Sequence, residues 1–113
     1  MDMSKYFKYE STFIPSEDVM KLDERILDDL YATSSTTEKS NIFFHLQNEY
    51  YYLLNGKEYK NAAHICYLIS YYLFTALTPP HSETLAREYA LTAIKLDDLP
   101  MYREWLSEVE MGN

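Results

Sequence analysis

Residues 42–77 form a long apolar run that holds seven of the twelve tyrosines in this 113-residue chain. Only residues 55–58, Asn-Gly-Lys-Glu, interrupt the run. Two apolar segments of this length on either side of a short polar turn predict a buried helical hairpin. The run has more tyrosine hydroxyl groups than a small core normally contains, so some tyrosines are expected to reach a surface where a partner docks.

The scarcity of turn residues favours helices over a sheet. The chain has two glycines and four prolines, too few for the many tight turns of a sheet-rich fold. With 47% hydrophobic residues, it has enough apolar surface for one core. The sequence therefore predicts one all-α domain spanning residues 1–113, with about five helices arranged mostly as antiparallel hairpins.

The N-terminal part is predicted to form an arm followed by one helix. Residues 1–15 alternate aromatic and polar side chains and end at Pro15, which indicates an irregular arm, flexible or extended. Ser16 is placed to cap a helix over residues 17–31. Apolar residues repeat along this helix with the three-and-four spacing of one buried stripe, formed by Val19, Leu22, Ile26 and Leu30.

The remaining four helices are bounded by breaks in the sequence. A helix over residues 37–54 is apolar nearly all round and is therefore expected to be central. Asn55 and Gly56 tolerate the left-handed conformation that ends helices, so a third helix is expected over residues 57–77. Two further helices are expected to begin near residues 82 and 100, at breaks that contain proline. The first would bury Leu85, Tyr89, Ala93 and Leu96. The second would bury Met101, Tyr102, Trp105, Leu106 and Val109.

The net charge of −8 is concentrated in two segments. Residues 17–31 hold six acids and two bases, residues 97–113 hold five acids and one base, and the rest of the chain is balanced. An acidic protein lacks the lysine and arginine contacts with phosphates that supply most nucleic-acid affinity. We therefore expect no direct nucleic-acid binding and a basic protein as the partner.

The chain is expected to be cytoplasmic and not to enter a membrane. Its N-terminus has acid and aromatic residues where a signal peptide needs a basic start and an apolar core. The most apolar stretch, residues 62–77, has 16 residues and is too short to span a bilayer. A single cysteine, Cys66, lies within it and is expected to pack as a small apolar side chain in a reducing compartment.

The spacing of residues 52–80 resembles a tetratricopeptide repeat, a 34-residue helix-turn-helix unit. The matching positions are Tyr52, Gly56, Tyr59, Ala62, Tyr72 and Pro80, whereas Asn55 and Leu68 depart from the pattern. Residues 86–100 resemble the closing half of a second repeat in another register. The resemblance implies a concave protein-binding face on the inner sides of the helices, with Tyr50, Tyr51, Tyr59 and Tyr67 as candidate contacts. The alternative is that these four are core or rim tyrosines.

No arrangement of residues predicts catalysis, a cofactor or a metal site. The histidines at positions 45, 64 and 81 lie far apart, and neither HExxH nor CxxC occurs. Two isolated glycines cannot form a phosphate-binding loop. His45, near Asn48 and Glu49, is expected to be a satisfied, half-buried histidine. The chain is therefore predicted not to be an enzyme.

Four acids near the C-terminus are candidates for binding a basic partner. Carboxylates at a helix C-terminus oppose the helix dipole, so Asp97 and Asp98 carry an electrostatic cost that suggests a use. Together with Glu104 and Glu108 they would engage lysines or arginines, and Trp105 among them is a candidate anchor. The alternatives are a solubilising surface and a core tryptophan.

These features lead to two functional hypotheses. The first is a stoichiometric inhibitor of a basic protein, such as an immunity protein that neutralises a toxin, for example a nuclease. The second is a chaperone or assembly adaptor that holds an amphipathic segment of a secretion or structural subunit. The same tyrosines would also allow two copies of the chain to pair as a homodimer.

Overall fold

The computed structural model describes residues 2–112 and contains no strand within them. Met1 of the expected arm and Asn113 at the end of the expected domain lie outside the described residues. The expectation of an all-α fold is confirmed. The elements, in chain order, are the 3-10 turn η1 (Ser4–Phe7), α1 (Ser16–Val19), α2 (Glu24–Ala32), α3 (Thr36–Asn55), α4 (Tyr59–Tyr72), the π turn η2 (Leu73–Leu77), α5 (Ser82–Leu96) and α6 (Pro100–Met111).

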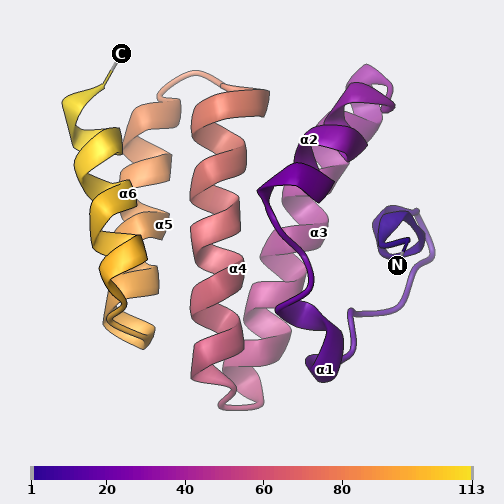
Figure 1. Cartoon of the computed structure of the whole chain (residues 1–113). Coiled ribbons are helices and arrows are strands. Elements are labelled where there is room, and N and C mark those ends of the chain that lie inside the picture. The colour runs from indigo at the N-terminus through magenta and orange to yellow at the C-terminus, as the bar shows by residue number, and fades with distance from the viewer. Residues whose placement is uncertain (1, 113) are drawn as a thin grey trace.

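Helices α3 to α6 run antiparallel to their neighbours in chain order (Figure 1). Helix α4 packs against both α3 and α5, and α6 packs on α5. The short helices α1 and α2 also contact α4, so the N-terminal part of the chain covers a side of α4 that α3 and α5 leave open. The expectation of mostly antiparallel hairpins is met by this arrangement.

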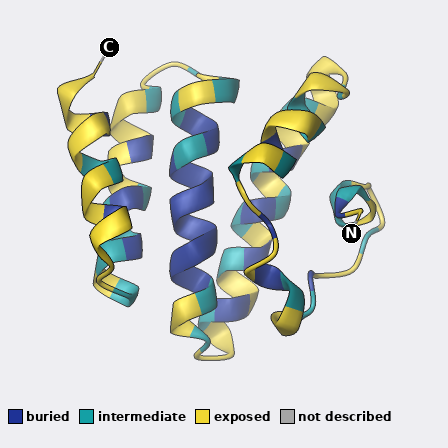
Figure 2. Cartoon of the chain, in the orientation of Figure 1, coloured by how far each residue is buried: buried dark blue, intermediate teal, exposed yellow. Residues whose placement is uncertain are grey.

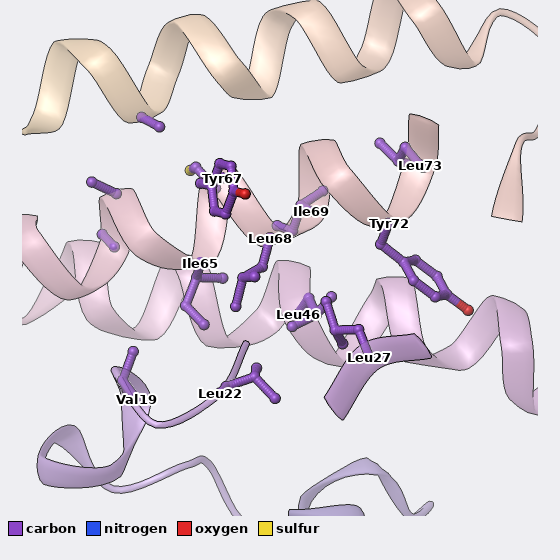
Figure 3. Close-up of a cluster of buried hydrophobic side chains, with 14 of the residues drawn as sticks. Val19, Leu22, Leu27, Leu46, Ile65, Tyr67, Leu68, Ile69, Tyr72 and Leu73 are labelled. Atoms are coloured by element: carbon purple, nitrogen blue, oxygen red, sulfur yellow. The ribbon is translucent and has the colours of Figure 1, made fainter. Parts of the chain in front are cut away.

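The central helix is α4, which corrects the expectation that the helix over residues 37–54 would be central. Every residue from Ala62 to Ser70 is buried (Figure 2), whereas α3 leaves Phe44, Tyr51 and Tyr52 about half exposed. The Ile65 and Leu68 side chains of α4 point toward α3 and toward the segment before α2 (Figure 3). The apolar pattern of residues 37–54 therefore reflects aromatic residues at the surface as well as a buried face.

The prediction of a single helix over residues 17–31 is wrong, because helix α1 ends at Val19 and helix α2 begins only at Glu24. Asp23 adopts an extended backbone, and its side chain accepts a hydrogen bond of 3.0 Å from the Ile26 N–H, so it is the N-cap of α2. The Leu22 carbonyl lies between the two helices and forms a hydrogen bond of 2.6 Å with Nε2 of the buried His64. The break brings both Val19 and Leu22 fully into the core.

The turn between α3 and α4 places a lysine, not Asn55 or Gly56, in the left-handed conformation. Lys57 has φ of +58°, whereas Gly56 has φ of −81°. The Lys57 N–H donates to the Leu54 carbonyl, and the Glu58 N–H donates to the Leu53 carbonyl. These two bonds form a Schellman motif that ends α3 one residue later than the glycine predicts.

The N-terminal arm is packed against the helices near both of its ends and is exposed around Tyr9. Met3 and Ile14 are 2% and 3% exposed, and the arm contains one turn of 3-10 helix and no strand in residues 2–15. The Ile14 N–H donates a 2.8 Å hydrogen bond to Glu49 Oε1 of α3. Ser16 is the first residue of α1, so the N-cap position predicted for it belongs to Pro15.

Candidate functional site

Helices α2 and α4 are joined by two matched bonds between tyrosines and carboxylates. The Tyr67 hydroxyl donates to Glu24 Oε2 at 2.6 Å, and the Tyr71 hydroxyl donates to both oxygens of Asp28 at 2.9 Å. Each pair spans 43 residues of sequence. Since each partner lies one turn from its counterpart on its own helix, α2 and α4 run side by side in the same direction here.

Helix α6 adds Trp105 to these tyrosines. The half-buried Trp105 ring lies 6.0 Å from the Tyr67 ring and 5.8 Å from the Tyr71 ring, measured between centroids. Its Nε1–H donates to Ser70 Oγ at 2.7 Å, and the Ser70 hydroxyl donates to the Ala86 carbonyl at 2.6 Å. Ser70 therefore fixes the indole of α6 to α4 and α5, so the three aromatic rings keep a defined arrangement.

The two acidic segments of the sequence meet at Tyr67. The pKa of Tyr67 is raised above its ordinary value, chiefly by burial, then by the hydrogen bond and the charge of Glu24. The charge of Glu108, from α6, raises it further. Acids from both ends of the chain thus lie around one aromatic group, and we call this surface the acidic-aromatic face. It comprises Glu24, Asp28, Tyr67, Tyr71, Trp105 and Glu108, together with Glu104, which lies one turn before Glu108 on α6.

Within residues 2–112, no lysine or arginine forms an ion pair with the carboxylates of this face. Among residues 2–112, the ion pairs use other acids, so Glu24, Asp28, Glu104 and Glu108 form none. Glu104 is exposed on α6, one turn before Glu108. A hydroxyl donor orients a carboxylate without neutralising its charge, so these groups remain able to pair with cations from outside the molecule.

Asp97 and Asp98 lie in the turn between α5 and α6. Asp97 is the C-terminal cap residue of α5. Both oxygens of Asp98 accept hydrogen bonds of 2.6 Å from Arg103, and this contact lowers the pKa of Asp98. Arg103 thus offsets the electrostatic cost at Asp98 within the chain, so that carboxylate has a structural partner at the start of α6.

The four candidate tyrosines do not form one surface. Tyr50 and Tyr51 are neighbours on α3, with ring centroids 4.9 Å apart, and Tyr51 is 53% exposed. Tyr59 is 46% exposed at the start of α4. Tyr67 is 6% exposed, and its hydroxyl is hydrogen-bonded to Glu24 of α2. It therefore lies beneath the acidic-aromatic face and positions the Glu24 carboxylate.

Three residues of the face, Glu24, Asp28 and Tyr71, were not singled out from the sequence, nor was Ser70, which holds Trp105 in place. A spacing of four residues separates Glu24 from Asp28 and also Tyr67 from Tyr71. That matched spacing is the available signal, because residues four apart share a helix face and two such pairs fit together when helices run parallel. The sequence alone does not say which helices are neighbours.

A second surface exposes aromatic side chains along α3 and the arm. Phe13 of the arm stacks on Tyr52 with centroids 4.2 Å apart and an interplanar angle of 9°. Phe44 and Tyr51 are exposed on the same helix as Tyr52, and Tyr9 of the arm is 93% exposed. This surface is made of aromatic side chains from the arm and α3, so it differs in chemistry from the acidic-aromatic face.

The Cys66 thiol and the His64 imidazole are both buried on α4. Burial raises the pKa of the Cys66 thiol and lowers the pKa of His64. Within residues 2–112, no three His, Cys, Asp or Glu side chains gather closely enough to hold a metal ion. No helix in that range is both long and apolar enough to cross a membrane.

Comparison with known proteins found no match among protein-family models, curated proteins or solved structures.

Proposed function

We propose that this chain is a protein-binding module that inhibits a basic partner by covering it in a one-to-one complex. The observation that carries the proposal is the meeting of two acidic segments around Tyr67 and Trp105. An immunity protein that neutralises a basic toxin, such as a nuclease, is the class of inhibitor that fits these properties. The module binds protein, with no direct contact to nucleic acid or membrane, and acts in the cytoplasm.

The chemistry of the acidic-aromatic face suits arginine in particular. Glu24 and Asp28 present oriented carboxylates, and a guanidinium group can bind a carboxylate through two parallel hydrogen bonds. The same guanidinium can stack on the partly exposed rings of Tyr71 and Trp105. In such a complex the acidic field accelerates encounter, and the aromatic contacts slow dissociation.

Inhibition follows from occupancy and needs no chemical step. The substrate cleft of a nuclease is positively charged because it must hold phosphates. An acidic face docked over that cleft excludes the nucleic acid. The lysine and arginine side chains that would bind phosphates then bind the carboxylates of the face instead. The module would therefore compete with substrate, and its inhibition would weaken as salt screens the charges.

The test uses a neutral-face variant with Glu24→Gln, Asp28→Asn, Glu104→Gln and Glu108→Gln. The amides keep an oxygen that can accept the Tyr67 and Tyr71 hydroxyls, so the change removes charge with little loss of packing. A control variant with the same charge change carries Glu10→Gln, Glu17→Gln, Glu83→Gln and Glu88→Gln, which are exposed acids outside the face.

Each protein is immobilised and used to capture partners from a lysate of the source organism. We expect the wild type and the control variant to retain a basic protein that salt releases, and the neutral-face variant to lose it. The released protein is then assayed for nuclease activity with and without added wild-type chain. A partner held equally by all three proteins would contradict the proposal.

The aromatic surface of α3 and the arm favours a second candidate function. Phe13, Phe44, Tyr51 and Tyr52 are each about half exposed and would suit an amphipathic helix, as in a chaperone or assembly adaptor. Apolar contact of this kind is insensitive to salt. A partner that survives high salt but is lost on Phe44→Ala and Tyr51→Ala would favour this function over inhibition.

A further inference from the structure

The N-terminal arm closes over a cavity on α3. The cavity has a volume of about 360 Å³ and lies between arm residues 6–14 and one side of α3. Aromatic rings from the arm and the half-buried His45 line it. His45 also contacts Phe7 edge to face, with centroids 5.8 Å apart. The arm therefore forms one wall of a space large enough to hold water.

The buried carboxyl of Glu49 connects the arm to α3. Glu49 is 2% exposed and lies on the cavity lining. Its Oε1 accepts the Ile14 N–H at 2.8 Å, and its Oε2 has no hydrogen-bond partner among the described residues. No lysine or arginine within residues 2–112 forms an ion pair with it. A buried carboxylate without a cation is costly, so the closed arm favours the protonated acid.

The groups around Glu49 do not supply a compensating positive charge. Tyr6 and Tyr9 from the arm and His45 from α3 line the same cavity. Glu58, in the turn before α4, is the charged group that acts on Glu49, and its negative charge disfavours ionisation. Burial is the main cause that raises the pKa of Glu49 to about 7, and the Ile14 N–H opposes it.

We propose that Glu49 is a pH-dependent latch, which holds the arm on α3 while its carboxyl is protonated and releases the arm when the carboxyl ionises. Release exposes the side of α3 that contains His45 and leaves the contacts of α4 with α3 and α5 in place. The arm is held by the Glu49–Ile14 hydrogen bond, by the burial of Met3 and Ile14 at the edge of the core, and by aromatic contacts of Phe7 and Phe13 with α3. The opening is local, since the packing of α4 against α3 and α5 does not depend on the arm.

The direction of the pH dependence follows from proton linkage. In the open arm the carboxyl is solvated and returns to its ordinary pKa of 4.5, while in the closed arm the pKa is about 7. Closure is therefore strongest below about pH 4.5 and weakens as pH rises toward 7, by about 70-fold between pH 5 and pH 8. His45 acts in the opposite sense, because burial lowers its pKa and its protonation at low pH favours an open arm.

Hydrogen exchange tests the latch in the full chain. Protection of the amides of residues 2–14 is measured between about pH 5 and pH 8, relative to a free peptide of the same sequence. The variant Glu49→Gln keeps an acceptor for the Ile14 N–H but cannot ionise. We expect wild-type protection to fall with pH relative to this variant by about 70-fold, while the fluorescence of Trp105 stays constant.

Equal pH dependence in the wild type and in Glu49→Gln would overturn the proposal. A second measurement does not depend on the variant folding: the titration of the Glu49 carboxyl carbon followed by NMR in the wild type. We expect this carboxyl to titrate in the pH range in which Ile14 loses protection. Titration at the ordinary value of a solvated glutamate, with Ile14 still protected at higher pH, would also overturn it.

Discussion

Ser70 is the residue whose single hydroxyl joins three helices. It is fully buried on α4, accepts from the Trp105 indole of α6 and donates to the Ala86 carbonyl of α5. Nothing in the sequence marks this serine, since its partners lie 35 and 16 residues away. A buried hydroxyl within an apolar run signals only that some partner exists.

Replacing Ser70 by alanine is expected to destabilise the fold by about 1–3 kcal/mol, because the half-buried Trp105 N–H loses its acceptor inside the protein. The exposed Ser107→Ala on α6 serves as the control and should change stability by less than about 0.5 kcal/mol. Urea unfolding measures both effects, and the indole N–H resonance of Trp105 reports the lost bond. An unchanged indole resonance in Ser70→Ala would contradict the assignment.

At the scale of helices and turns, the residues that end or begin helices predicted the observed elements better than the spacing of apolar residues did. The hairpin within residues 42–77 and the proline-bounded starts of α5 and α6 follow from turn and proline residues that act locally. The break at Leu22 and Asp23 did not follow, because a helical stripe continues through it. Its causes are the Asp23 cap and a bond to His64, 42 residues away.

The turn between α3 and α4 offers a prediction at this scale. Lys57 adopts φ of +58°, which costs a non-glycine residue about 1–2 kcal/mol, so Lys57→Gly is expected to stabilise the fold by roughly 0.5–1 kcal/mol net. Gly56 has an ordinary negative φ, and a methyl group added there meets no atom closer than 3.4 Å. Gly56→Ala is therefore expected to stabilise by about 0.4–1 kcal/mol.

Thermal or urea unfolding of the two variants distinguishes the two descriptions of this turn. If Gly56 held the left-handed position, as the sequence suggests, Gly56→Ala would destabilise the fold and Lys57→Gly would bring no gain. Lys60→Gly, within the first turn of α4, controls for the general cost of glycine and should lower stability.

At the scale of the whole molecule, the fold gathers charge that the sequence shows only as two separate segments. The counts of acids in residues 17–31 and 97–113 predicted acidic surfaces, and Glu104, Glu108 and Trp105 were candidates within the second segment. Tyr67 was a candidate for a different reason, the resemblance to a tetratricopeptide repeat. That α2 and α6 both border Tyr67 could not be predicted, because the order of helices around α4 is set by long-range packing. The function of the face remains our proposal.

The most direct test of this face is NMR titration of the labelled protein with a helix-forming, arginine-rich peptide. The matched control peptide carries citrulline, which has the shape of arginine without its charge. We predict saturable shifts centred on Glu24, Asp28, Tyr71, Trp105 and Glu108, at one peptide per chain. The shifts should vanish with the citrulline peptide and with the neutral-face variant, and persist in the control variant. Shifts spread over all acidic residues, or centred on Phe44 and Tyr51 of α3, would contradict the account.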